Sequence, residues 1–304
     1  MRGLSFILIV ITSFFFTGII FRTKSILSGR KGRGIFQPMK DIWRLFQKGS
    51  VYSPTSSFIF KIAPNIYFAS VVIAIMLIPF GDQKGVFSFN CDFVFFAYIL
   101  AVGKFFNIIG ALDTGSSFEG MGASREALYS LLAEPAFFIL MGSFALLTGY
   151  TSFSDIFSSI HFGSYISYAI GGLASFVLVI IAMIENSRMP VDDPETHLEL
   201  TMVHEVMILD NSGFDLGLIF YASHLKFAMY GAIIVNLLLT PGKEWYYSIP
   251  IFIAVQVLFA IVVGTIESFM ARFRMSHNPQ FIFALTSISL LIFITVLLMT
   301  GKIL

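Results

Sequence analysis

Cysteine and charged residues are scarce in this sequence of 304 residues. It contains one cysteine, Cys91, and 12% charged residues, against 57% hydrophobic and 16% aromatic residues. A single cysteine can form neither an internal disulfide nor a thiolate cluster site, so we expect the chain to bind no Fe–S cluster and no structural zinc. A mean hydropathy of +0.85 is far above that of soluble domains and places most of the chain in a bilayer.

Long apolar runs recur along the whole chain. A helix needs roughly 20 mostly apolar residues to cross about 30 Å of hydrocarbon. The sequence therefore predicts an all-α integral membrane protein, a single transmembrane domain over residues 1–304, with eight spans at about 4–21, 58–80, 91–110, 127–149, 164–184, 216–240, 248–269 and 280–300. No small-x-small cleavage site follows the first run, which we interpret as a retained helix and not as a signal peptide.

Lysine and arginine are distributed unevenly between the connections. Of the 19, twelve follow the first, third, fifth and seventh runs, four lie at the termini or in the other loops, and three lie within spans. The positive-inside rule then predicts a multi-pass protein of the cytoplasmic (inner) membrane with both termini outside. The cytoplasmic loops are expected at about 22–57, 111–126, 185–215 and 270–279.

A short amphipathic helix is predicted at the membrane surface after the first span. Apolar residues recur at helical spacing between Ile35 and Phe46, and Pro38 stands where a first-turn proline belongs. The basic, glycine-rich residues before it lack the Gly-Lys-Ser/Thr ending and the preceding strand of a phosphate loop, which disfavours nucleotide binding. They either set topology and meet anionic lipid or dock a partner, and the sequence leaves both roles open.

A glutamate interrupts the fourth apolar run. Glu134 is expected roughly two turns inside the hydrocarbon, where a carboxylate costs a few kcal/mol or more unless it is paired, hydrated or protonated. Pro135 loosens the helix at the same place. Ser124 is predicted to cap this span, with Gly120 and Gly122 in tight turns before it. Glu134 is either a functional ionisable group or a neutral glutamate hydrogen-bonded between helices.

Residues 185–215 concentrate carboxylates. They hold eight of the 18 acidic residues but one basic residue, Arg188. Pro190 and Pro194 predict an extended turn and then a cytoplasmic helix from Pro194 to about Leu209. Because neighbouring carboxylates raise one another's pKa and histidine titrates near neutrality, we interpret the stretch as a hydrated proton relay; a solvated acidic face is the alternative. His197 and His204 lack the short spacing of zinc ligands, so no metal site is predicted.

Further ionisable residues extend this pattern into the later spans. His224 and Lys226 fall near the middle of the sixth span, and Glu267 ends the seventh. Ionisable residues at such depth usually face a bundle interior or a water path. The last span carries no charge and is expected to serve packing or to face lipid.

Several runs spread over nearly the whole chain carry a resemblance to a known family. They are Gly32–Asp41, Gly120–Glu126, Glu134–Pro135, Met189–Met202, His204–Glu205, Ser212–Gly213 and Ala271–Arg274. In these runs the chain resembles the membrane subunit of energy-converting, group 4 membrane-bound [NiFe]-hydrogenases, the formate hydrogenlyase subunit 4 family. It resembles more distantly the quinone-site membrane subunit of respiratory complex I.

The resemblance implies a non-catalytic subunit of an oxidoreductase complex that pumps protons or sodium ions. Such a subunit docks a cytoplasmic Fe–S small subunit and a hydrogenase-type large subunit, which carry the Fe–S clusters and a [NiFe] centre, beside antiporter-like membrane subunits and lipid. This chain itself is expected to hold no active site, no cofactor and no nucleic acid. The expected relay residues are Glu134, Glu185, Asp192, Asp193, Glu195, Glu199, Glu205, Asp210, His224, Lys226 and Glu267, and the residues expected to hold the loops and the docked arm are Arg30, Arg33, Arg125, Arg188, Arg272 and Arg274.

Two alternatives remain open. A complex I-type quinone-site subunit usually carries a glutamate in place of His197, an aromatic in place of His204 and an arginine in place of Glu267, and these departures weigh against a working quinone chamber. A stand-alone secondary transporter predicts an internal inverted repeat and ionisable groups at the midplane, neither of which the sequence displays.

Overall fold

The computed structural model describes residues 3–160, 165–193, 202–239 and 245–301. Within these ranges the regular structure is helical, as the sequence predicted. The helices are α1 (Leu4–Leu27), α2 (Gln37–Phe46), α3 (Phe58–Leu77), α4 (Asp92–Asp113), α5 (Ser117–Thr148), α6 (Phe153–Ser159), α7 (Tyr165–Glu185), α8 (His204–Met207), α9 (Gly213–Leu238), α10 (Trp245–Phe269) and α11 (Asn278–Met299).

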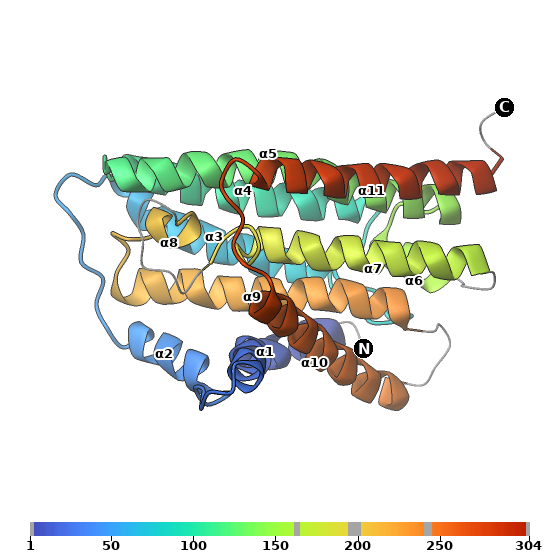
Figure 1. Cartoon of the computed structure of the whole chain (residues 1–304), viewed down its shortest axis with the longest axis horizontal. Helices are drawn as coiled ribbons and strands as arrows, with labels where there is room; N and C mark the ends of the chain where they lie inside the picture. Colours follow the sequence, from blue (N-terminus) through green and yellow to red (C-terminus); the bar gives the residue numbers. More distant parts are fainter. Residues whose placement is uncertain (1–2, 161–164, 194–201, 240–244, 302–304) are drawn as a thin grey trace.

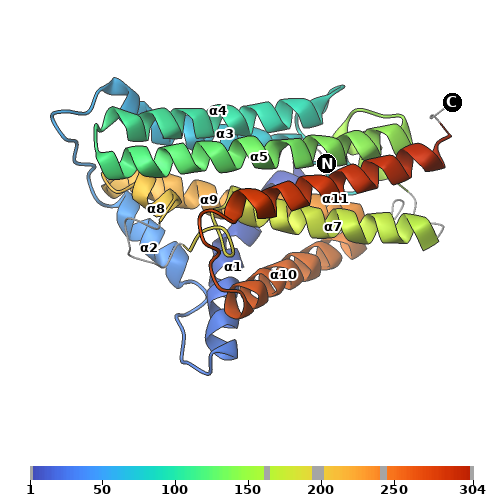
Figure 2. The same cartoon turned by 45° about the horizontal axis from the view of Figure 1, so that its top comes forward.

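Eight of these helices are long and apolar enough to cross a membrane, which confirms the predicted number of spans. Six of them lie roughly alongside one another, namely α3, α4, α5, α7, α9 and α11, whereas α1 and α10 pack together on one side and run obliquely to these six (Figure 1; Figure 2). Helix α9 is the most enclosed of the eight, since it packs against α1, α2, α3, α7 and α10. The uncharged α11 packs against α5 and α7 and is the least enclosed, in agreement with its predicted role in packing or facing lipid.

The predicted loop at 111–126 is wrong, because α4 and α5 extend into it and leave only residues 114–116 between them. Helix α5 has 32 residues and a length of about 48 Å, which exceeds the roughly 30 Å of a hydrocarbon core. Ser124 is therefore an interior helical residue and not a cap. Gly122 is also helical, and a Cβ atom placed there would lie 2.5 Å from the Cγ1 atom of Val206 in α8. The glycine thus permits close helix packing, where the sequence suggested a turn.

The predicted amphipathic helix is α2, which begins with Pro38 in its first turn. Its Ile42 is buried against the bundle, while Trp43 on the other side is 62% exposed. Helix α2 packs against α9 and α1 and lies at the same end of the bundle as α8 (Figure 1). We call this end, with residues 186–193 and 202–212, the acidic-loop end.

The acidic segment contains less helix than expected. Residues 186–193 form turns, as the prolines predicted, and residues 194–201 lie outside the described ranges. A helix continuous to Leu209 is wrong, because the described part is helical only in α8. Asp192 accepts hydrogen bonds from the backbone N–H groups of Val203 and His204, at 3.2 and 3.1 Å. This distant carboxylate satisfies the donors at the start of α8 and so fixes where the helix begins.

Candidate functional site

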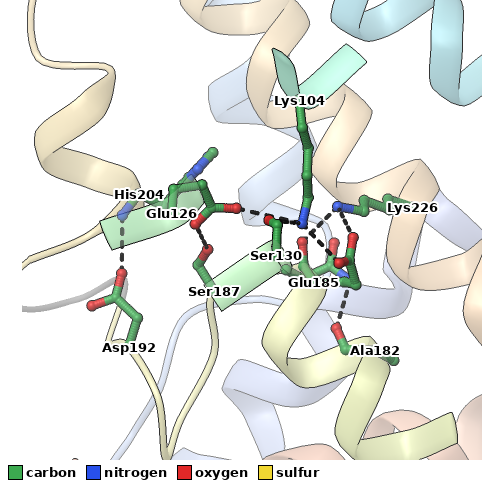
Figure 3. Close-up of polar contacts among 10 residues, drawn as sticks. Lys104, Glu126, Ser130, Ala182, Glu185, Ser187, Asp192, His204 and Lys226 are labelled. Atoms are coloured by element: carbon green, nitrogen blue, oxygen red, sulfur yellow. Dashed lines mark hydrogen bonds and ion pairs between the residues drawn. The ribbon is translucent and has the colours of Figure 1, made fainter. Parts of the chain in front are cut away.

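The centre of the candidate site is Glu185, the last residue of α7 (Figure 3). One of its carboxylate oxygens, Oε1, accepts a hydrogen bond from Lys104 Nζ of α4 at 2.7 Å. The other, Oε2, lies 2.8 Å from Lys226 Nζ of α9, which also donates to the Glu185 backbone carbonyl at 2.6 Å. Glu185 is 9% exposed and Lys226 is 1% exposed. A single carboxylate is thus held between two buried ammonium groups from two other helices.

A second carboxylate balances the charge of this site. The Oε1 atom of Glu126 in α5 lies 3.7 Å from Lys104 Nζ, and its Oε2 atom accepts a hydrogen bond from Ser187 at 3.3 Å. Lys104 also donates to Ser130 at 2.6 Å. We call Lys104, Glu126, Glu185 and Lys226 the ion cluster. Its two carboxylates and two ammonium groups compensate each other, as buried charges require.

The sequence identified only half of the ion cluster. Glu185 and Lys226 were predicted as relay residues, whereas Lys104 and Glu126 were assigned no role. The rule that marks ionisable residues within apolar runs applies to Lys104 as well and would have found it. Glu126 was missed because the sequence predicted a loop at 111–126 and so placed this residue outside a span. Lys226 lies roughly 20 Å along α9 from its first residue, in the middle of the helix as expected.

Glu134 connects the ion cluster with the side of the bundle. Glu126, Ser130 and Glu134 are spaced four apart on α5 and therefore share one helix face. The half-buried Glu134 lines a recess between α4 and α5 together with Lys104 and Glu185. A row of polar side chains thus extends from the cluster toward the lateral surface.

Asp192 and Glu205 lie at the acidic-loop end, outside the spans. Burial raises the pKa of Asp192 to about 6, although Arg272, whose Nη2 atom lies 2.8 Å from Asp192 Oδ1, acts in the opposite direction. Burial and the charge of Asp192 raise the pKa of Glu205 to about 7, opposed by Arg188. Both carboxyl groups are therefore able to exchange protons near neutral pH, as a relay requires.

A cavity of about 530 Å³ lies between α1, α2, α9 and the acidic segment. Aromatic side chains and a set of polar side chains line it. His224 contributes a buried Nδ1 atom with no hydrogen-bond partner among the described residues. The other ionisable residues of its lining are Arg33, Asp41, Arg188, His204 and Glu205.

Arg188 and Glu267 form an ion pair beside this cavity. The Arg188 Nη1 atom lies 3.4 Å from Glu267 Oε1, and its guanidinium lies over the rings of Phe21 and Phe227. Lys24 Nζ lies 3.3 Å from the other Glu267 oxygen. Arg188 is 7% exposed and directed inward, so its contacts fasten the acidic segment to α1, α9 and α10.

The other predicted arginines fall into two groups. Arg125 and Arg272 hold the acidic segment, because Arg125 donates to the backbone carbonyl of Met202 at 2.9 Å and Arg272 pairs with Asp192. Arg30, Arg33 and Arg274 are exposed at the acidic-loop end, with Arg33 over the ring of Phe21. Docking of a partner by these residues stays a prediction.

Some predicted relay residues lie away from the ion cluster. The side chain of Asp210 is exposed, and its backbone N–H donates to Glu119 at 2.9 Å. Asp193 belongs to the turn before the undescribed residues. Glu195, Glu199 and His197 lie outside the described ranges.

Together these features define a class of protein: a multi-pass membrane protein with a line of ionisable groups that leads from one end of the bundle to its interior and then to its side. A family model for NADH dehydrogenase matches residues 2–298, nearly the whole chain. The chain belongs to the NADH dehydrogenase family.

Relatives from two branches of respiratory complexes match this chain. It is 29% identical to hydrogenase-4 component C of Escherichia coli (strain K12) over 299 residues, 95% of this chain and 93% of that protein. It is 25% identical to formate hydrogenlyase subunit 4 of the same strain over 288 residues, 92% and 93% of the two chains. It is 23% identical to an NADH-quinone oxidoreductase subunit of Methylococcus capsulatus over 205 residues, 67% and 63% of the two chains. The resemblance inferred from the sequence motifs is confirmed.

A solved structure confirms the fold. A chain of the membrane-bound sulfane sulfur reductase, an archaeal respiratory membrane complex, superimposes with a TM-score of 0.81 at 19% identity. The superposition covers 96% of this chain and 98% of that one. The bundle is therefore an arrangement found in respiratory membrane complexes.

Proposed function

We propose that this chain is the membrane anchor and ion-coupling subunit of a multisubunit, redox-driven pump for protons or sodium ions, of the membrane-bound hydrogenase type. The ion cluster carries this proposal. Replacing a buried ion pair by well-packed apolar residues is often neutral or stabilising by about 1–4 kcal/mol, so four buried charges do not serve the stability of an apolar bundle. Ionisable residues within spans instead mark the path of an ion.

The path begins at the acidic-loop end, which on this proposal faces the cytoplasm, with both chain termini outside. Asp192 and Glu205 exchange protons there. The ion cluster follows, and Glu134 passes either the ion or the change in charge from the cluster to the side of the bundle. Antiporter-like membrane subunits would lie against the recess that Glu134 lines.

The partners on the cytoplasmic side would be an Fe–S small subunit and a hydrogenase-type large subunit. They would hold the Fe–S clusters and the [NiFe] centre, and this chain would hold no cofactor of its own. The exposed Arg30, Arg33 and Arg274 are available for contact with such an arm. The support is the nearly full-length similarity to hydrogenase-4 component C and formate hydrogenlyase subunit 4.

The energies involved are compatible with coupling through carboxyl groups. Moving one proton against the membrane potential costs roughly 2.3 kcal/mol per 100 mV. A pKa change of one unit corresponds to about 1.36 kcal/mol. A redox-driven shift of roughly two units in a buried carboxyl group would therefore match the work of moving one proton across about 100 mV.

The test uses the intact complex, purified in mild detergent and reconstituted into liposomes. Reduced methyl viologen supplies electrons, hydrogen evolution reports redox turnover, and a pH-sensitive dye together with a sodium-sensitive dye reports ion movement. We expect Glu134→Gln to retain turnover and to lose roughly tenfold or more of the coupled ion movement. The control is Asp155→Asn, which alters a carboxylate in α6 that pairs with Lys84 at 3.6 Å, away from the ion cluster. Full coupling in Glu134→Gln would contradict the proposal.

One observation favours a second candidate, the quinone-site subunit of a complex I-type NADH dehydrogenase. The cavity of about 530 Å³ combines aromatic and polar lining in the volume range of small-molecule sites. Nickel, iron and quinone analysis of the purified complex separates the two candidates. Nickel with a hydrogenase-type large subunit supports the hydrogenase type, whereas bound quinone with iron and no nickel supports the complex I type. A chain that purifies alone would support a transporter instead.

A further inference from the structure

Two cavities of this protein share a wall. The first is the large cavity beside α2, and the second is a much smaller polar cavity that Lys104, Glu126 and Glu185 line. The smaller one has a volume of about 10 Å³, close to the space that one water molecule needs. Asn186, His204 and Ser223 line both cavities. These three side chains therefore separate the large cavity from the ion cluster.

Two of the three shared side chains are engaged with the backbone. Ser223 donates its hydroxyl hydrogen to the carbonyl of Ile219 at 3.1 Å, and Asn186 donates its amide to the carbonyl of Ala182 at 2.8 Å. An asparagine amide also does not gain or lose a proton near neutral pH. His204 is thus the one titratable group of the three.

The position of His204 is fixed by its backbone, and one ring nitrogen is enclosed. The backbone N–H donates to Asp192 at 3.1 Å (Figure 3). Nε2 is buried without a hydrogen-bond partner among the described residues, and so is Oδ1 of Asn186, although the His204 residue as a whole is half-buried. An unsatisfied buried polar atom costs about 1–3 kcal/mol. His204, Asn186 and Glu126 all line the small cavity, which makes a water there the candidate partner of the two atoms.

We propose that His204 is the residue through which protons pass between the large cavity and the ion cluster. This inference rests on the proposed function. A proton from Glu205 or from water in the large cavity forms a new N–H bond at the ring nitrogen Nδ1. The N–H bond at Nε2 breaks, and its proton passes through one water to the Glu126 carboxylate, where an O–H bond forms. Proton exchange with water then restores the first tautomer, because the N–H bond at Nδ1 breaks and a new N–H bond forms at Nε2, and no electron is transferred.

The surroundings of His204 fit this role. The ionisable groups around it include Asp192, Arg188 and Glu205 in the acidic segment and, on the packed helices, Lys104, Glu126, Glu185, His224 and Lys226. Burial lowers the pKa of His204, while the charge of Glu126 acts against that change. Burial therefore favours the neutral imidazole, so a ring that takes up a proton releases it readily. Glu205, with a pKa of about 7, is a suitable donor on the cavity side.

The experiment uses the reconstituted complex described above. In His204→Gln the side chain keeps polar atoms in the same region but cannot accept and release a proton. We expect roughly tenfold or more loss of proton movement per hydrogen formed, with turnover in the presence of an uncoupling ionophore within about twofold of the wild type. His204→Ala should lose the same coupling and regain part of it when imidazole is added, because the large cavity admits the free ring. The matched control is Ser223→Ala, which alters the same wall and should retain coupling.

The outcomes separate the inference from the proposed function when Glu134→Gln is measured in parallel. Retained coupling in His204→Gln with lost coupling in Glu134→Gln overturns the role of His204 and leaves the proposed function standing. Retained coupling in both variants overturns both. Lost coupling in His204→Ala without imidazole rescue assigns His204 a structural role and also overturns the inference. If His204→Ala fails to assemble, the coupling measured in His204→Gln decides whether His204 carries the proton.

Discussion

The ion cluster and the acidic-loop end both contain buried carboxyl groups, but they hold them in different ways. In the ion cluster, Glu185 lies within 2.8 Å of two ammonium groups, and every charged member stands on a long helix. At the acidic-loop end, Asp192 and Glu205 stand on turns and on the one-turn helix α8. No ion pair within 4.0 Å joins Glu205 to any described residue. The helices thus hold all four charges of the ion cluster in pairs, whereas in the irregular segment Asp192 pairs with Arg272 and the carboxyl group of Glu205 has a pKa raised to about 7.

The difference indicates which step of ion coupling each region performs. A paired, desolvated charge is costly to change, so the ion cluster is suited to respond as a unit to a proton or a displaced loop. A carboxyl group with a raised pKa changes its charge for a small free-energy difference. Proton uptake is therefore expected at the acidic-loop end and charge rearrangement in the bundle.

Removing one ammonium group should break the ion cluster and give the largest effect. Lys104→Met leaves Glu126 and Glu185 with one cation between them, and we expect a loss of about 3–5 kcal/mol in the free energy of unfolding, because an uncompensated buried charge remains. The midpoint of thermal unfolding in detergent reports it. The control is Lys61→Met, since Lys61 is exposed on α3 and its ammonium group lies over the Tyr52 ring, outside the ion cluster. Equal midpoints for the two variants would contradict the assignment.

Neutralising Glu205 should change how the free energy of unfolding depends on pH, and so test whether the acidic-loop end titrates near neutrality. Its folded-state pKa of about 7 exceeds the ordinary value of 4.5, so the folded protein binds this proton more tightly than the unfolded chain. Its contribution to stability therefore falls as pH rises from about 4.5 to 7 and is constant above. Glu205→Gln should remove that decline and gain about 3 kcal/mol at pH 8.

Thermal unfolding in detergent between pH 5 and 8 measures this change. Asp192→Asn should alter the profile with the same sign, because its pKa is also raised, to about 6. Loss of its contact with Arg272 makes this second variant less stabilising. A Glu205→Gln profile that still declines as steeply as the wild type would contradict the assignment.

Gly122 tests whether the two regions depend on each other. A Cβ atom at this position of α5 would lie 2.5 Å from Val206 Cγ1 and 2.8 Å from the Val203 carbonyl oxygen. We expect Gly122→Ala to destabilise the protein by about 1–2 kcal/mol and to shift α8, which carries His204 and Glu205. Gly142→Ala on the same helix is the matched control, because no atom of the described residues, its own turn of helix aside, lies within 4 Å of its Cβ position. Faster hydrogen exchange confined to residues 202–212 would report the local shift.

The connection between α2 and α3 provides the smallest expected effect. Tyr52, which is 38% exposed, donates a hydrogen bond to Asp215 at the start of α9 at 2.7 Å. Tyr52→Phe should cost about 0.5 kcal/mol and leave ion coupling unchanged, because this contact lies outside both regions. Thermal unfolding and the liposome assay measure the two quantities. Lost coupling in this variant would extend the functional region to the α2–α3 connection.

Residue patterns predicted most of the fold because they depend on short-range properties. The length of an apolar run against the thickness of a bilayer gave the eight spans, and helical spacing with Pro38 gave α2. The same rules failed at α5, where serine and glycine suggested a cap and turns. Packing of Gly122 against α8 outweighed the low helix propensity of glycine there.

The sequence by itself determined the solvent, the eight spans and the chemical types of the ionisable residues, since each follows from composition or from spacing within one segment. Only the tertiary structure decided which charges meet. Lys104 and Glu185 are 81 positions apart, and the hydrogen bond between them depends on how α4 and α7 pack. The place of His204 between two cavities likewise depends on Asp192 starting α8 at that residue. Pairing of distant residues is a property of helix packing in three dimensions, and no local rule contains it.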